Sequence, residues 1–189
     1  MADMIADGRI DVTDHTVLEL GAGTGLPGIL SALRGAQQVV LSDYDDPKLL
    51  GFIRSNVLRC IPEHILPNVR VIGHIWGQDT EDILQFAPSR FSRIICADVL
   101  WDTFSNPALL NTLLALLAPS PESRIIVISG LHTGRGPLAR FLRLAAFRGL
   151  VPDETGLREF EVGGAEQLGM KIVLMVTFGN GIDGPWNLN

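Results

Sequence analysis

Three glycines at alternate positions form the stretch best suited to bind a nucleotide. The three glycines (21, 23 and 25) directly follow the apolar residues Val17, Leu18 and Leu20, which predict a buried strand. Apolar residues at helical spacing over 26–33 then predict a helix. Such a turn brings backbone N–H groups to the positive end of a helix, and no Cβ keeps a ligand away. The pattern therefore predicts a nucleotide or nucleoside site, with a ligand-free turn as the structural alternative.

The type of ligand depends on the residues that flank the glycines. Gly23, Gly25 and Gly28 satisfy G-x-G-x-x-G, the fingerprint of dinucleotide binding. Glu19 precedes them at the end of the strand. A carboxylate there would repel a pyrophosphate but would suit the amino group of a methionine moiety. Glu19 therefore favours a ligand other than a dinucleotide.

Asp43 follows the second predicted strand, residues 38–41, by two positions. It follows the glycine turn by about 20 positions. In nucleotide-binding sheets, an acidic residue at this spacing accepts hydrogen bonds from the ribose hydroxyl groups. The structural alternative is helix capping, because Asp45 or Asp46 before Pro47 is a good helix start. Both roles are compatible if Asp43 binds the ribose and Asp46 caps the helix.

Two tryptophans follow predicted strands. Trp76 comes after the strand 69–72 and could stack on an adenine, or simply close the edge of the sheet. Asp98 and Trp101 come after the strand 93–97, where ligands bind in open α/β sheets. An acid and an aromatic ring can orient an amine and stabilise positive charge. The structural alternatives are that Asp98 caps the next helix and that Trp101 packs beneath the cleft.

Composition restricts the class of protein. The chain has 189 residues, 47% of them hydrophobic, and a net charge of 15 − 21 = −6, with no basic run. These values predict one globular domain and argue against nucleic acid as the main partner. The two cysteines make neither a disulfide framework nor a metal-ligand cluster. No secretory signal or apolar run of membrane-spanning length is present, so we expect an intracellular protein and no membrane partner.

Strands and helices alternate along the chain and predict an α/β, Rossmann-like fold with a mostly parallel sheet. Further strands are expected at 124–129, 160–162 and 172–178, and the last two suit an antiparallel pair at the C-terminal edge. His132 should face the same cleft as Asp98 or be a polar loop residue. Residues 179–189 are expected to form a flexible tail, and the start of the domain before the first strand is short.

Taken together, four segments resemble a known group of enzymes. Residues 17–28, 42–45, 76–77 and 97–101 resemble the seven-strand S-adenosylmethionine-dependent methyltransferases, and within them the small protein methyltransferases that modify lysines of non-histone proteins. Residues 98–101, followed by 130–136, resemble a fungal branch first described as nicotinamide N-methyltransferase-like. That branch is associated with N-terminal and lysine methylation of translation elongation factor 1-alpha.

The resemblance, which extends over about residues 10–178, implies roles for individual residues. The implied contacts to S-adenosylmethionine are Glu19, Gly21, Gly23, Gly25, Asp43, Trp76 and Ala97. The implied catalytic residues are Asp98 and Trp101. Many relatives carry tyrosine at the position of Trp101. Relatives also have an upstream, tryptophan-bearing segment over the cofactor, so the short start of this chain predicts weaker cofactor binding or activity.

The sequence therefore predicts a cytoplasmic enzyme that transfers a methyl group from S-adenosylmethionine to an amine nitrogen of a protein. The amine would be a lysine or an N-terminus, and elongation factor 1-alpha is the first partner to consider. No metal is expected to take part. The alternatives are a methyltransferase for a small molecule such as nicotinamide, an NAD-binding module, and an inactive remnant that binds cofactor or a partner.

Overall fold

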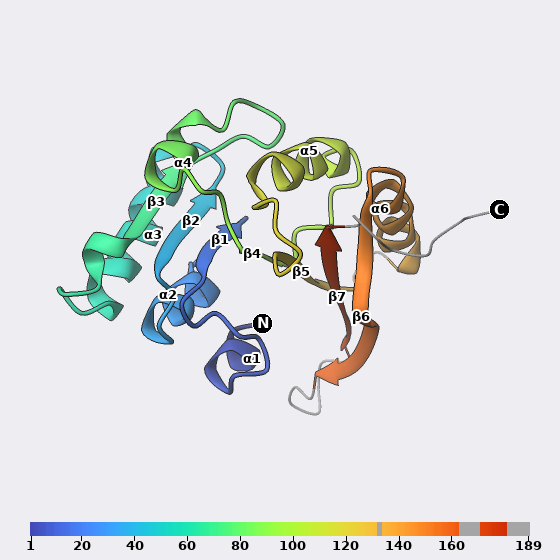
Figure 1. Cartoon of the computed structure of the whole chain (residues 1–189), viewed down its shortest axis with the longest axis horizontal. Helices are drawn as coiled ribbons and strands as arrows, with labels where there is room; N and C mark the ends of the chain where they lie inside the picture. The colour runs from blue at the N-terminus through green and yellow to red at the C-terminus, as the bar shows by residue number, and fades with distance from the viewer. Residues whose placement is uncertain (132–133, 163–170, 181–189) are drawn as a thin grey trace.

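In the computed structural model, which describes residues 1–131, 134–162 and 171–180, seven strands form one sheet with helices on both faces (Figure 1). The strands β1 (Thr16–Leu20), β2 (Gln38–Asp43), β3 (Val69–Gly73), β4 (Arg93–Ala97) and β5 (Arg124–Gly130) pair in parallel. The α/β, Rossmann-like architecture with a mostly parallel sheet is confirmed.

The strand order is β3-β2-β1-β4-β5-β7-β6. β2 and β3 are added on one side of β1, and β4 and β5 on the other, so the strand order reverses between the neighbouring strands β1 and β4. Leu20, the last residue of β1, pairs with Ser42 of β2 on one side and with Cys96 of β4 on the other. The carboxyl ends of β1, β2 and β4 therefore meet at one edge. In open α/β sheets a crevice forms at this switch point, and ligands bind there.

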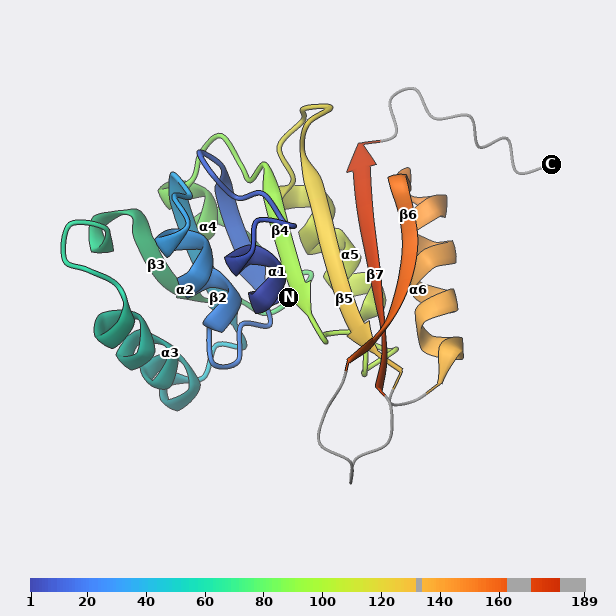
Figure 2. The same ribbon diagram turned by 90° about the horizontal axis from the view of Figure 1, so that it is seen from below.

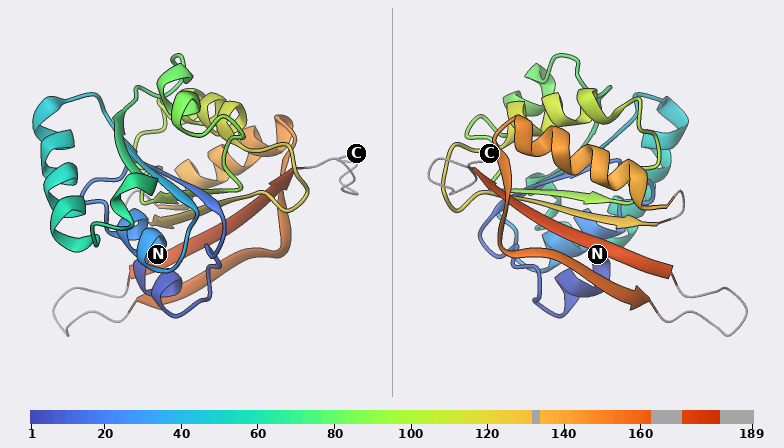
Figure 3. Two further views of the ribbon diagram at one scale, coloured as in Figure 1. Left: turned by 60° about the vertical axis from the view of Figure 1, so that its left-hand side comes forward. Right: turned by 90° about the vertical axis from the view of Figure 1, so that its right-hand side faces the viewer.

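Two layers of helices cover the sheet (Figures 2 and 3). One face carries α1 (Ala2–Ala6), α2 (Leu26–Leu33) and α3 (Pro47–Cys60), and the other carries α4 (Glu81–Phe86), α5 (Asn106–Leu116) and α6 (Arg135–Phe147). The short 3-10 helix η1 (Leu66–Asn68) leads into β3. None of the helices that the structure describes has both the length and the hydrophobicity needed to cross a bilayer.

The alternation of side chains along the strands assigns each residue to one of these layers. Val17 packs with α1 and α2, whereas Leu18 and Leu20 pack with α4 and α5, and all three are fully buried. Because both faces are covered, the central strands are apolar at nearly every position. The same alternation decides which strand-end side chains can reach the pocket described below.

The C-terminal edge differs in part from the prediction. β6 (Leu150–Val162) begins ten residues before the predicted strand, and β7 (Lys171–Asn180) pairs antiparallel with β5 and with β6. The first half of β6 was not predicted because it contains Pro152 and Gly156, which are typical of loops. The pairing register shifts there, and a bulged strand at the edge of a sheet tolerates such residues. Gly179 and Asn180 belong to β7 and not to a tail, and residues 181–189 lie outside the described residues.

Candidate functional site

The glycine turn after β1 has a backbone that other residues would rarely adopt. Gly21, Gly23 and Gly25 have φ angles of +67°, +56° and +78°, in the left-handed region. A Cβ on Gly21 would lie 2.7 Å from Val99 Cγ1, and one on Gly25 would lie 2.7 Å from Leu41 Cδ2. The turn therefore needs glycine at Gly21 and Gly25 both for its φ angles and for its close packing on neighbouring side chains.

Asp43 links the end of β2 to this turn. Its Oδ2 accepts a hydrogen bond of 2.6 Å from the Gly23 N–H, and its Oδ1 accepts one of 2.7 Å from the Tyr44 N–H. The helix start is satisfied by a different residue, because Asp46 Oδ1 accepts from two N–H groups in the first turn of α3, each at 2.9 Å. The two roles are therefore separated: Asp46 caps α3, and Asp43 faces the glycine turn.

Glu19 lies behind the turn and not in the pocket. Strand alternation places it on the α2 face, where it is 1% exposed and its Oε2 accepts a 2.9 Å hydrogen bond from the Gly28 N–H. Burial raises the pKa of Glu19 to about 8, and the nearby Asp43 charge adds to the effect. Glu19 thus fixes the start of α2 to β1. The contact of Glu19 with a methionine amino group stays a prediction. So does the cofactor contact of Ala97, which lies two positions after Ile95, a residue that packs on the α2 face.

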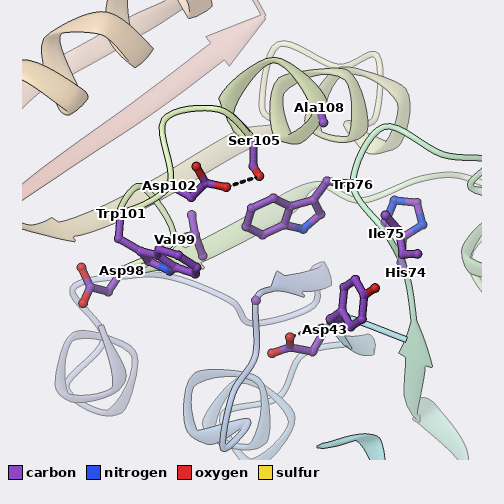
Figure 4. A pocket seen from close by; sticks show the side chains of 12 residues that line it. Asp43, His74, Ile75, Trp76, Asp98, Val99, Trp101, Asp102, Ser105 and Ala108 are labelled. Carbon is purple, nitrogen blue, oxygen red and sulfur yellow. Dashed lines mark hydrogen bonds between the residues drawn. The ribbon is translucent and has the colours of Figure 1, made fainter. Parts of the chain in front are cut away.

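A pocket of about 440 Å³ opens at the carboxyl ends of the strands (Figure 4). Its lining residues are Gly21, Asp43, Tyr44, His74, Ile75, Trp76, Asp98, Val99, Trp101, Asp102, Ser105 and Ala108. Five predicted site residues are among them: Gly21, Asp43, Trp76, Asp98 and Trp101. Residues from four separate loops are thereby brought together at the predicted edge of the sheet.

Trp76 forms part of the pocket wall after β3. It is half-buried against the core of the α4–α5 layer, and its Cζ2 lies 3.6 Å from the position of a Cβ on Gly21. The loop is anchored to α5, because Thr112 Oγ1 accepts from the Gly77 N–H at 2.8 Å and lies 3.1 Å from His74 Nε2. Trp76 therefore both packs on the core and presents its ring to the pocket beside the glycine turn.

Asp98 joins the ends of β4 and β5. It has a φ of +59°, unusual for a residue other than glycine, and its Oδ1 accepts from the Gly130 N–H at 3.0 Å. The helix-capping alternative for Asp98 is wrong, because the N-cap of α5 is Ser105. The alternative that Trp101 packs beneath the cleft is also wrong, since 69% of Trp101 is exposed and it lines the pocket.

Sequence reasoning did not identify Asp102. This residue follows Trp101 in the loop before α5, and its carboxylate lines the pocket. Its Oδ2 accepts from Ser105 Oγ at 2.5 Å and its Oδ1 from the Phe104 N–H at 2.9 Å. The Ser105 hydroxyl, followed by the Phe104 N–H, lowers the pKa of Asp102. The available signal was its place next to Trp101, directly after a strand end.

The pocket is acidic. Asp43, Asp98 and Asp102 line it, and among its described lining residues none is lysine or arginine. His74 is no source of positive charge near neutral pH, because burial lowers its pKa. His132, predicted to face this cleft, lies outside the described residues. In the described part of the chain, no three side chains of His, Cys, Asp or Glu are grouped as metal ligands.

Comparison with known proteins adds the family context. The model of a protein family described as lysine methyltransferase matches residues 2–141. A protein N-terminal and lysine N-methyltransferase EFM7 of Candida glabrata is 34% identical over 117 residues, covering 61% of this chain and 46% of the relative. Protein N-lysine methyltransferase METTL21A of Mus musculus is 42% identical over 108 residues, covering 56% of this chain and 46% of the relative. The chain thus spans about half the length of these curated relatives.

Solved structures match the fold across most of the chain. The methyltransferase domain of a bacterial Hen1 protein has a TM-score of 0.67 at 14% identity, covering 95% of this chain and all of that one. An O-methyltransferase from Bacillus cereus, solved in complex with S-adenosylhomocysteine, has a TM-score of 0.64 at 19% identity and covers 94% of this chain and 79% of that one. At these identities the likeness establishes the fold.

Proposed function

This chain belongs to the lysine methyltransferase family, and from that premise we propose that it transfers a methyl group from S-adenosylmethionine to an amine nitrogen of a protein. The observation that carries the proposal is the bond between Asp43 and Gly23, which lies beside an acidic pocket with aromatic walls. The names of EFM7 and METTL21A, both protein N-methyltransferases, support a protein as the acceptor.

The residues present fit the cofactor. Gly21 lines the pocket without a Cβ, Asp43 offers carboxylate oxygens to a ribose diol, and Trp76 offers a flat face to an adenine. We assign Gly23 and Gly25 to the same turn as backbone contacts. The family resemblance implies Glu19 and Ala97 as the remaining contacts, although neither residue lines the pocket described above. When bound, S-adenosylmethionine supplies a methyl group on a positively charged sulfur that a neutral nitrogen can attack in line.

The residues after β4 would handle the acceptor. Asp98 accepts N–H bonds from the amine and orients its lone pair toward the cofactor side of the pocket. Trp101, with most of its ring exposed, forms a wall against which the acceptor side chain lies. These residues act by proximity and orientation, which can account for a large part of a bimolecular barrier. The proton that the amine must lose goes to solvent at the open side of the pocket.

The domain organisation and the cellular compartment belong to the same proposal. We infer one methyltransferase domain over the chain, built on the seven-strand sheet with its antiparallel C-terminal pair; the strand order and the pairings of β6 and β7 support this. We assign the activity to the cytoplasm. The two free cysteines, Cys60 and Cys96, are compatible with a reducing compartment.

The first acceptor to examine is translation elongation factor 1-alpha, on the strength of the family resemblance. The net charge of −6 and the acidic pocket suit a basic protein. The test is transfer of a radiolabelled methyl group from S-adenosylmethionine to purified elongation factor and, separately, to nicotinamide. Asp98→Asn and, as a surface-charge control, Glu63→Gln are assayed alongside the unchanged chain.

We expect label on the protein, a large loss in Asp98→Asn and no change in Glu63→Gln, since Glu63 is exposed and does not line the pocket. Label on nicotinamide and not on protein would overturn the choice of acceptor. A chain that labels neither, nor any protein of a whole extract, would contradict the proposed activity.

A further inference from the structure

The two carboxylates after β4 are held in different ways. Asp98 lies at the end of the strand, where Gly130 N–H bonds to its Oδ1. In Figure 4 its carboxylate points away from Trp76, whereas Asp102 points toward Ser105 at the start of α5. Both residues line the pocket, Asp98 from the first position after β4 and Asp102 from the middle of the loop 98–105 that leads to α5. Their contributions to ligand binding can therefore differ.

The Asp102 carboxylate is fixed in place and can still accept bonds. The Ser105 hydroxyl and the Phe104 N–H each donate to a different oxygen. An ionised carboxylate has about four acceptor positions, so about two lie open after these bonds. The same two donors stabilise the negative charge and keep Asp102 ionised. Asp102 is thus an anion oriented by the loop itself, and it is a poor proton acceptor.

The surroundings of Asp102 favour a cation. The pocket has two further carboxylates, Asp43 and Asp98, and no lysine or arginine among its described lining residues. Trp101, next in sequence to Asp102, and Trp76 both line the pocket, and aromatic faces attract ammonium groups. A charge-assisted bond from an ammonium N–H to a fixed carboxylate is stronger than a bond between neutral groups.

We propose that Asp102 recognises the ammonium form of the methyl acceptor, so that the pocket selects a primary amine over a neutral nucleophile. The inference rests on the proposed function and specifies its acceptor: a lysine side chain or an N-terminal amine gains from Asp102, whereas an uncharged pyridine ring or hydroxyl group does not. Asp102 acts in binding and orientation, and Asp98 and Trp101 remain the residues assigned to the transfer itself.

The test compares three ligands by calorimetric titration and needs no protein substrate. The first is S-adenosylhomocysteine. The second is an analogue in which a tertiary amine replaces the sulfur and carries an alkyl arm ending in a primary amine. The third has the same arm ending in a methyl group. Each is titrated into the unchanged chain, into Asp102→Asn, which keeps the shape of the side chain, and into Glu63→Gln as the charge control.

We expect the unchanged chain and Glu63→Gln to bind the amine-tipped analogue about tenfold more tightly than the methyl-tipped one. Asp102→Asn should lose most of that preference while binding S-adenosylhomocysteine as before, which also shows that it is folded. An unchanged preference in Asp102→Asn, or none in the unchanged chain, would overturn the role of Asp102 and leave the proposed function standing. A folded chain that binds none of the three ligands would instead refute the proposed function.

Discussion

The Asp43 carboxylate accepts a 2.6 Å hydrogen bond from the backbone N–H of Gly23 and so joins the end of β2 to the turn after β1. One side chain thereby orders the turn and keeps further acceptor positions for a ligand. Two elements that are about 20 residues apart in the chain become one binding surface.

Replacing Asp43 should therefore weaken cofactor binding. Asp43→Ala removes a charged acceptor, and bonds to charged groups contribute roughly 1.5–3 kcal/mol, so Kd for S-adenosylhomocysteine should rise roughly ten- to hundredfold. Asp46→Ala is the control, because Asp46 caps α3 and does not line the pocket. It should lower the unfolding free energy by about 1 kcal/mol and leave Kd unchanged. Equal losses of affinity in both variants would mean that Asp43 acts through stability alone.

Stacking on Trp76 predicts a second loss of affinity. Base–aromatic stacking contributes about 1–3 kcal/mol, so Trp76→Ala should weaken S-adenosylhomocysteine binding roughly ten- to hundredfold, and Trp76→Phe much less. Trp101→Ala is the matched control, because Trp101 is assigned to the methyl acceptor and not to the cofactor. It should change Kd for S-adenosylhomocysteine by less than about threefold. The ranking is checked by titration at one salt concentration. A larger loss in Trp101→Ala than in Trp76→Ala would reverse the assignment of the two rings.

Two helical glycines should respond oppositely to alanine. A Cβ on Gly28 would lie 2.7 Å from Glu19 Oε2 and 2.7 Å from Leu41 Cγ, so Gly28→Ala should lower the unfolding free energy by about 1–3 kcal/mol. Gly51, on the exposed side of α3, has no atom within 4 Å of that position. Gly51→Ala should raise the unfolding free energy by about 0.5–1 kcal/mol. Urea unfolding measures both, and a neutral Gly28→Ala would show that the close packing relaxes freely.

The buried Glu19 predicts a pH dependence of stability. Its pKa is about 8 in the folded chain, against an ordinary value of 4.5 for a glutamate side chain, because burial disfavours the charged form. Between these values the folded chain holds a proton that the unfolded chain has released, so this group makes the folded state less stable as pH rises from about 4.5 to about 8.

Glu19→Gln keeps an acceptor for the Gly28 N–H and cannot ionise, so it should remove this dependence. The variant should gain stability relative to the unchanged chain as pH rises from 5 to 8, by an amount on the order of a few kcal/mol. Urea unfolding at several pH values checks this, with Glu63→Gln as the exposed control. A constant difference between Glu19→Gln and the unchanged chain across the range would show that Glu19 titrates normally.

Most strands and helices could be predicted because burial on both faces of the sheet leaves long apolar runs, and glycine or proline stands at their ends. The first half of β6 could not, since Pro152 and Gly156 resemble loop residues and only the edge position of the strand accommodates them. The position of three further residues at one edge of the sheet could be predicted for a related reason. The carboxyl ends of parallel strands share one edge, so Asp43, Trp76 and Asp98 had to meet there.

The finer geometry of the site depends on features that spacing does not reveal. Leu20 faces the α4–α5 layer and Glu19 faces α2, so Glu19 supports the turn from behind. Asp102 was missed because its orientation comes from two bonds within a short irregular loop. Such local hydrogen bonds have no periodicity that a sequence pattern could show.

The most direct test of the central claim is calorimetric titration of the folded chain with S-adenosylhomocysteine and, in a parallel experiment, with NAD. The glycine turn, Asp43 and Trp76 predict micromolar binding of S-adenosylhomocysteine and no measurable binding of NAD. Binding of NAD in place of S-adenosylhomocysteine, or binding of neither ligand, would contradict the assignment of this pocket as a methyltransferase cofactor site.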